Sequence, residues 1–95
     1  MVRNLSVAGA ALALFISGLV DAQAADRASC EQYARAALVQ VKLGLANHGC
    51  AGGLQGTRWS PDYNVHFDWC LGVSFQATGA ERDARTAYLK ACRGQ

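Results

Sequence analysis

Ser60, Asp62 and His66 stand close together in the stretch SPDYNVH and are the residue types of a hydrolytic triad. Asp62 and His66 would also be i,i+4 neighbours on a helix. However, Ser60 precedes Pro61 and is better used as a helix cap, and the chain has no G-x-S-x-G turn. So short a chain also offers little cleft to exclude water. We therefore expect no catalytic residue and no enzyme activity, with a hydrolase as a remote alternative.

Metal binding is the second chemistry that these residue types allow. His48, His66 and Asp62 could ligate a metal ion, but the chain has no H-x3-H or H-E-x-x-H spacing. Its four cysteines lie 20, 20 and 22 positions apart, whereas zinc sites usually contain close C-x2-4-C pairs. We expect no metal and no cofactor, and no redox role because C-x-x-C is absent.

The segment RWSPDYNVH offers a candidate binding surface. Arg58, Trp59, Tyr63 and His66 are the side chains that we expect to reach solvent. Together they could form an aromatic platform for a sugar, a peptide or a peptidoglycan fragment, and the guanidinium of Arg58 could bind a carboxylate through two hydrogen bonds. The alternative is that these rings simply fill the core of a short chain.

The remaining aromatic residues are assigned to the core. A small disulfide-bonded domain must fill its interior with its few large side chains. We expect Phe67 and Trp69 to be buried, and Tyr33 and Tyr88 to be at least partly buried. The Cys70 side of this segment would then build the core, and the Arg58 end would be the candidate surface.

The first residues have the pattern of a cleavable signal peptide. Arg3 precedes sixteen uncharged residues, and Ala22 and Ala24 follow as an A-x-A site. Sixteen residues fall short of the roughly 20 that span a bilayer, so a retained anchor is disfavoured. The sequence predicts a signal peptide over 1–24, cleavage between Ala24 and Ala25, and one periplasmic or secreted domain over 25–95.

Composition limits the partners of that domain. After cleavage, eight Lys and Arg face six Asp and Glu, a net charge near +2 that is too small to indicate nucleic-acid binding. The four cysteines all lie in the mature part, and an even count in a short exported chain indicates two disulfides. We expect an envelope component or another protein as the partner.

Periodicity predicts an all-α fold, a small disulfide-stapled bundle of about three helices. The first helix begins with Ser29 as its cap and ends at Gly49, and a Gly-rich loop follows as far as Ser60. Residues 64–77 alternate like a strand, but Ser60, Pro61 and Asp62 form a helix start and no partner strand exists, so we predict a helix there. The last helix is expected from Thr78, in a T-x-x-E capping box, to Gly94.

The pairing of the cysteines is open among three connectivities. Our prediction pairs Cys30 with Cys92 and Cys50 with Cys70, which requires the first and last helices to run antiparallel. It would clamp the Gly-rich loop onto the middle helix and so hold Arg58 in place. The alternative, Cys30 with Cys70 and Cys50 with Cys92, suits an up-down-up bundle.

As a set, the motifs resemble a short four-cysteine domain of exported alphaproteobacterial proteins. The resemblance covers nearly all of the mature chain and implies no activity, cofactor or partner. It rests on five motifs and Gln40: C-x2-YA (Cys30 to Ala34), GC (Gly49 and Cys50), RW (Arg58 and Trp59), H-x2-WC (His66 to Cys70) and E-x3-R-x3-L-x2-C (Glu81 to Cys92).

The function that these observations favour is a small exported module that binds a ligand or interacts with the envelope. A periplasmic stress or chaperone-like protein is the alternative. Val39 and Leu43, on the outer face of the first helix, would then supply its client or dimer surface.

Overall fold

The computed structural model describes residues 24–93, and this part of the chain is mainly helical. The elements are α2 (Arg27–Leu45), α3 (His48–Ala51), the 3-10 turn η1 (Thr57–Trp59), α4 (Tyr63–Leu71) and α5 (Phe75–Cys92). The predicted all-α, disulfide-stapled fold is confirmed. Residues 1–23 of the predicted signal peptide and the predicted stop at Gly94 lie outside the described residues.

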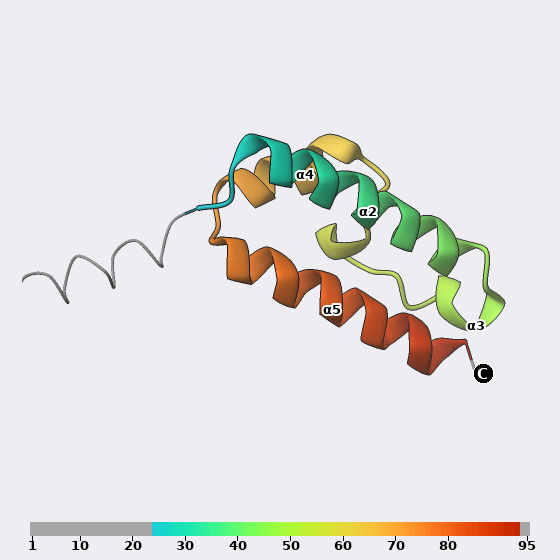
Figure 1. Cartoon of the computed structure of the whole chain (residues 1–95). Helices are drawn as coiled ribbons and strands as arrows, with labels where there is room; N and C mark the ends of the chain where they lie inside the picture. Colours follow the sequence, from blue (N-terminus) through green and yellow to red (C-terminus); the bar gives the residue numbers. More distant parts are fainter. Residues whose placement is uncertain (1–23, 94–95) are drawn as a thin grey trace, which may run out of the picture.

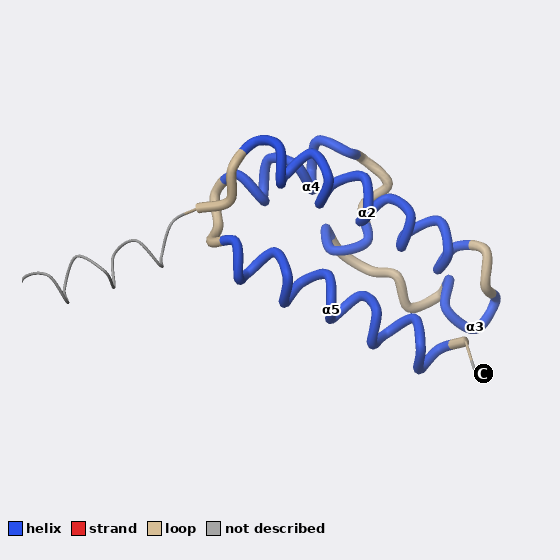
Figure 2. The backbone as a smooth tube through the Cα atoms, viewed as in Figure 1, coloured by secondary structure: helices blue, strands red, loops and turns tan. Residues whose placement is uncertain are grey.

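The three long helices follow an up-down-up course (Figure 1). The helices α2 and α5 run side by side in the same direction, and α4 runs back against the first half of α2. Tan loop segments in Figure 2 mark the return path from α3 through η1 to α4. The antiparallel arrangement that we predicted for the first and last helices is therefore wrong.

The disulfides follow the same course and correct the predicted pairing. Cys30 is bonded to Cys70, and Cys50 is bonded to Cys92. The first bond joins the start of α2 to the end of α4, and the second joins α3 to the end of α5. Because Cys50 is not bonded to Cys70, the predicted clamp of the Gly-rich loop onto the middle helix does not exist.

Local side chains explain where the helices begin. Asp26, and not Ser29, caps α2, with Oδ1 accepting from Ser29 N over 2.8 Å. Asp62 caps α4 and Ser74 caps α5 in the same manner, which corrects the predicted caps at Ser60 and Thr78. The predicted helix over 64–77 thus becomes α4, a short turn and the first residues of α5.

The predicted Gly-rich loop is partly helical. It contains α3, capped by Asn47, so Gly49 lies inside this one-turn helix and does not end the first helix. Gly56 has φ of 83°, a left-handed conformation that favours glycine. This turn redirects the chain into η1, which carries Arg58 and Trp59.

Two small cores lie at opposite ends of the bundle, one beside each disulfide. The first contains Ala25, Cys30, Tyr33, Ala34, Phe67 and Cys70. The second contains Val41, Cys50, Trp59, Leu89 and Cys92. A chain of this size buries little apolar surface, and each disulfide closes a loop of about 40 residues, so each should contribute roughly 4 kcal/mol. The bundle therefore depends on both bonds.

Ala25 joins the N-terminal end of the described chain to the bundle. It is buried, and its backbone N–H donates to the carbonyl of Val73 over 3.1 Å. Ala24 forms an isolated antiparallel bridge with Ser74. The residue that we expect to begin the mature protein is thus already part of the core.

Candidate functional site

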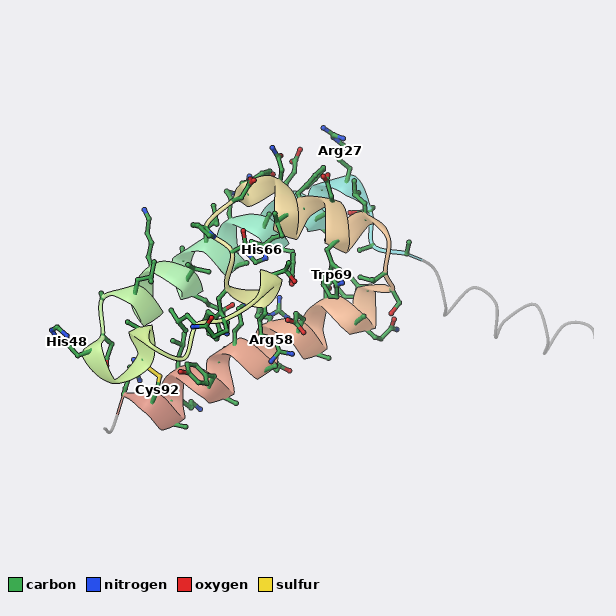
Figure 3. All side chains as sticks on the ribbon, turned by 180° about the vertical axis from the view of Figure 1, so that it is seen from behind. Arg27, His48, Arg58, His66, Trp69 and Cys92 are labelled. Carbon is green, nitrogen blue, oxygen red and sulfur yellow. A yellow bond between two sulfur atoms is a disulfide. The ribbon has the colours of Figure 1, made fainter. Side chains whose placement is uncertain are left out.

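A pocket of about 400 Å³ lies in the middle of the bundle, between α2, η1, α4 and α5. Its lining includes Tyr33, Arg58, His66, Trp69, Glu81 and Arg85. Figure 3 shows His66 and Trp69 pointing from α4 into the space between α4 and α5, where Arg58 also lies. The pocket therefore gathers aromatic and charged side chains from four elements.

Arg85 is the most unusual residue of the pocket, because its side chain is charged and yet only 1% exposed. Its Nε donates to Gln40 Oε1 over 2.7 Å, and its Nη1 donates to the carbonyl oxygen of Arg58 over 3.3 Å. The guanidinium lies over the ring of Tyr33, 5.2 Å from its centroid. Within residues 24–93, its Nη2 atom is buried and has no hydrogen-bond partner.

The carboxylate nearest to Arg85 is shared with another arginine. Glu81 accepts two hydrogen bonds from Arg58, from Nε over 2.6 Å and from Nη2 over 3.1 Å. Its Oε2 lies 3.7 Å from Nη1 of Arg85, beyond hydrogen-bond distance. The hydrogen bond to Glu81, more than its charge, raises the pKa of Arg58. Glu81 therefore forms its hydrogen bonds with Arg58, and within residues 24–93 Arg85 forms no hydrogen bond with a carboxylate.

His66 is buried, contrary to our expectation that it reaches solvent, and is 3% exposed. Its Nε2 lies 2.7 Å from the carbonyl oxygen of Ser60. A carbonyl can only accept, so Nε2 carries the proton and donates, which leaves Nδ1 as an acceptor when the ring is neutral. The ring of Tyr33 meets it edge-on, with 6.5 Å between centroids.

The arrangement of Ser60, Asp62 and His66 differs from a hydrolytic triad. The hydroxyl of Ser60 accepts from the backbone N–H of Asp62 over 3.1 Å, and Asp62 accepts from Asn64 N over 2.9 Å. His66 contacts the carbonyl of Ser60 and not its hydroxyl. In this geometry the three side chains serve the start of α4.

Trp69 forms an apolar wall of the pocket. It was expected in the core, but 41% of it is exposed. Its ring lies against Tyr33, with centroids 5.6 Å apart and a 34° angle between the planes. The reason is helical geometry: Phe67 and Cys70 occupy the buried face of α4, and Trp69 falls beside that face. An accessible indole on a buried tyrosine offers a surface for a flat group.

The other predicted surface residues divide between surface and core. Arg58 is exposed, with 47% of its side chain accessible, as expected. Trp59 is buried, contrary to expectation, and packs on Tyr88 with 5.3 Å between centroids. Tyr63 is half-buried and stacks on Phe67, outside the pocket lining. The structure thus brings Arg58 and His66 together in the pocket and leaves Trp59 and Tyr63 out of it.

Sequence reasoning did not assign Arg85, Gln40 and Tyr33 to the site. One sequence signal pointed to Arg85: it precedes Leu89 by four residues and Cys92 by seven, which is the helical spacing of one face of α5. An arginine in that apolar stripe must be buried and needs polar partners. Gln40, 45 positions earlier in the chain, could not have been paired with it from local patterns.

Among residues 24–93, no group of three or more His, Cys, Asp or Glu side chains is arranged to hold a metal ion. His48 points away from the molecule, far from His66 (Figure 3). Over the same residues, no helix has both the length and the apolar character needed to cross a membrane. No protein-family model, curated protein or solved structure matches the chain.

Proposed function

We propose that this protein is an exported binding module that holds a small envelope ligand in the pocket around Arg85. The observation that carries the proposal is the buried guanidinium, whose Nη2 lacks a partner beside a pocket of about 400 Å³. Unsatisfied buried polar groups are costly and uncommon in native proteins. A ligand that accepts from Arg85 would remove this cost.

Trp69 supplies the second element of the proposed site. Folding normally buries a tryptophan, yet this one stays 41% exposed at the pocket while Trp59 is buried elsewhere. Small-molecule sites combine apolar walls with a few polar groups that fix orientation. Trp69 and Tyr33 would form the wall, and Arg85 with His66 the polar groups.

We propose that the protein is exported and binds its ligand in the periplasm or outside the cell. Two disulfides are expected in an oxidising compartment, and the first residues have the signal-peptide pattern. We expect the exported protein to begin at Ala25, whose backbone N–H then becomes an ammonium beside the carbonyl of Val73. Intact-mass measurement tests this, and a product that retains residues 1–24 would contradict it.

Titration of the mature, oxidised protein with the low-mass fraction of a periplasmic extract tests the binding proposal. We expect the backbone NMR signals of Tyr33, His66 and Trp69 to shift as the extract is added. Trp69→Ala should abolish these shifts. Phe75→Ala is the matched control, because Phe75 is an exposed aromatic residue that does not line the pocket, and it should leave them unchanged.

Two results would contradict the proposal. One is the absence of any shift at the pocket. The other is a set of shifts confined to Val39 and Leu43, which are 57% and 53% exposed on α2. That second pattern would favour the stress or chaperone-like alternative, in which the outer face of α2 binds a client protein.

A further inference from the structure

We infer that the ligand of this pocket carries a carboxylate that binds Arg85 and a flat apolar group that stacks on Trp69. The inference rests on the proposed function and names the chemistry of its ligand. It follows from the hydrogen-bond donors of Arg85, the charges around the pocket and the position of the two rings.

The donors of Arg85 are incompletely used. A guanidinium has five N–H groups. One on Nε is bonded to Gln40 and one on Nη1 to the carbonyl of Arg58. Both on Nη2 lack a partner within residues 24–93. A carboxylate is an acceptor that matches the planar guanidinium, and its hydrogen bonds to a charged donor are stronger than those of a neutral acceptor.

The charge around the pocket also favours an anion. Arg58 and Arg85 contribute two positive charges and Glu81 contributes one negative charge, which leaves a net charge of +1 on these three residues. Glu81 forms its two hydrogen bonds with Arg58 and none with Arg85. One carboxylate from a ligand would neutralise the remaining charge, which is carried by a buried side chain and is therefore weakly screened.

Access to Nη2 requires a side chain to move, because this atom is buried. The Arg58–Glu81 ion pair is the candidate: it lines the pocket, and 47% of the Arg58 side chain is exposed. This pair is bidentate and the Glu81 side chain is only 22% exposed, so the ligand carboxylate must replace the hydrogen bonds that Arg58 loses when the pair opens. One oxygen of the ligand carboxylate would then bind Arg85, and Arg58 would remain available to bind the other oxygen.

The rings define the rest of the ligand. Trp69 and Tyr33 lie against each other at 5.6 Å, and Tyr33 also lies under the guanidinium of Arg85 at 5.2 Å. Trp69 and Arg85 also line the same pocket of about 400 Å³, so one small ligand can contact both side chains. The carboxylate and the flat group must then be joined by a short link, as they are in an aromatic or short-chain acid.

Benzoate and benzamide test this inference, because they share size and shape and differ in charge. Each is titrated into the wild-type mature protein at low ionic strength, and pocket shifts and the Arg85 Nε–H signal are followed by NMR. We expect benzoate to bind at least about tenfold more tightly, and to move the Arg85 signal. Equal affinities would overturn the inference while leaving the binding proposal intact.

Two other outcomes also overturn the inference. Tighter binding of phenylphosphate than of benzoate would reassign the pocket to phosphate. No binding of any of these probes would exclude the carboxylate site, and the binding proposal would still be judged by its own extract titration. The two proposals can therefore fail separately.

Glu81→Gln provides a variant that leaves Arg85 and its contacts with Gln40 in place. It raises the net charge of the three residues from +1 to +2, so benzoate should bind about threefold more tightly, and benzamide should be unaffected. Arg85→Lys keeps the charge and loses the planar fork, and benzoate should bind more weakly. If both variants bind benzoate as the wild type does, Arg85 does not hold the carboxylate.

Discussion

Gln40 on α2 accepts a 2.7 Å hydrogen bond from Arg85 Nε on α5, 45 positions later in the chain. The same amide donates from Nε2 to the carbonyl of Arg82 over 3.2 Å and to the hydroxyl of Thr86 over 3.0 Å. One glutamine therefore joins two parallel helices at three points and holds the side chain of Arg85, which lines the pocket. This contact lies between the α2 residues of the two small apolar cores, Ala34 in the first and Val41 in the second.

Replacing Gln40 with Ala should lower the free energy of unfolding by about 1–3 kcal/mol, because another donor of the buried Arg85 loses its partner. Urea unfolding measures the change. Val39→Ala is the control, since Val39 is an exposed neighbour on the same helix, and it should stay within about 0.5 kcal/mol. Equal effects in the two variants would show that the Gln40 contact does not stabilise the bundle.

Two adjacent glycines should respond differently to alanine. A Cβ at Gly53 would overlap the hydroxyl of Tyr88, which donates to the carbonyl of Cys50 over 3.1 Å. Gly53→Ala should therefore destabilise the protein by about 1–3 kcal/mol. Gly52 has φ of −68° and nothing within 4 Å of such a Cβ, so Gly52→Ala should be neutral or slightly stabilising. Thermal unfolding compares them, and a larger loss in Gly52→Ala would contradict this packing.

The disulfide connectivity is directly measurable. Lysine or arginine lies between each pair of successive cysteines, so non-reducing trypsin digestion and mass spectrometry can assign the bonds. We expect linked peptides that join Cys30 to Cys70 and Cys50 to Cys92, and no free thiol. A peptide that joins Cys30 to Cys92 would contradict the up-down-up course.

Reduction should unfold the domain. Each bond closes a loop of about 40 residues, and the loss of roughly 4 kcal/mol per bond is comparable with the whole stability of a domain this small. Circular dichroism with and without reductant measures the effect. A reduced protein that kept its cooperative thermal transition would show that the apolar cores suffice alone.

Asp26 predicts an acid-dependent step in stability. The hydrogen bond from the backbone N–H of Ser29 lowers the pKa of Asp26 below its ordinary value, and the Ser29 side chain adds to this. A carboxylate with a lowered folded-state pKa stabilises the fold fully above its unfolded value of about 3.9, and this contribution is lost as the pH falls through the folded-state pKa.

Asp26→Asn keeps a capping oxygen and removes the titration. Melting temperatures between about pH 6 and pH 2 should therefore fall more steeply in the wild type than in this variant. Parallel profiles would show that the Asp26 cap does not contribute to acid sensitivity.

Helix content was predictable because it depends on local patterns. The apolar spacing around Tyr33 and Tyr88 placed the long helices, and Ser60, Pro61 and Asp62 correctly indicated a helix despite the strand-like alternation that follows. The caps moved by a few residues because Asp26 and Ser74 compete with the equally suitable Ser29 and Thr78. Tertiary packing decides which of these residues becomes the cap, and the local sequence does not reveal that packing.

The pairing and the site were harder to predict, because both depend on the direction in which α5 runs. With α5 parallel to α2, Cys92 meets Cys50, and Arg85 meets Gln40. Of the four residues predicted to form the binding surface, only Arg58 and His66 line the pocket. Trp59 does not, because η1 directs it into the second core. Trp69, assigned to the core from its size, became the accessible wall.

The assignment of the pocket as the ligand site is tested most directly with the two tryptophans of the chain as ¹⁹F probes. In protein labelled with 5-fluorotryptophan, Trp69 reports on the pocket and the buried Trp59 serves as an internal control. On titration with the low-mass periplasmic fraction, we expect the Trp69 resonance to shift in a saturable manner while the Trp59 resonance stays in place. An unchanged Trp69 resonance, or a shift of Trp59 alone, would contradict the assignment of the pocket as the ligand site.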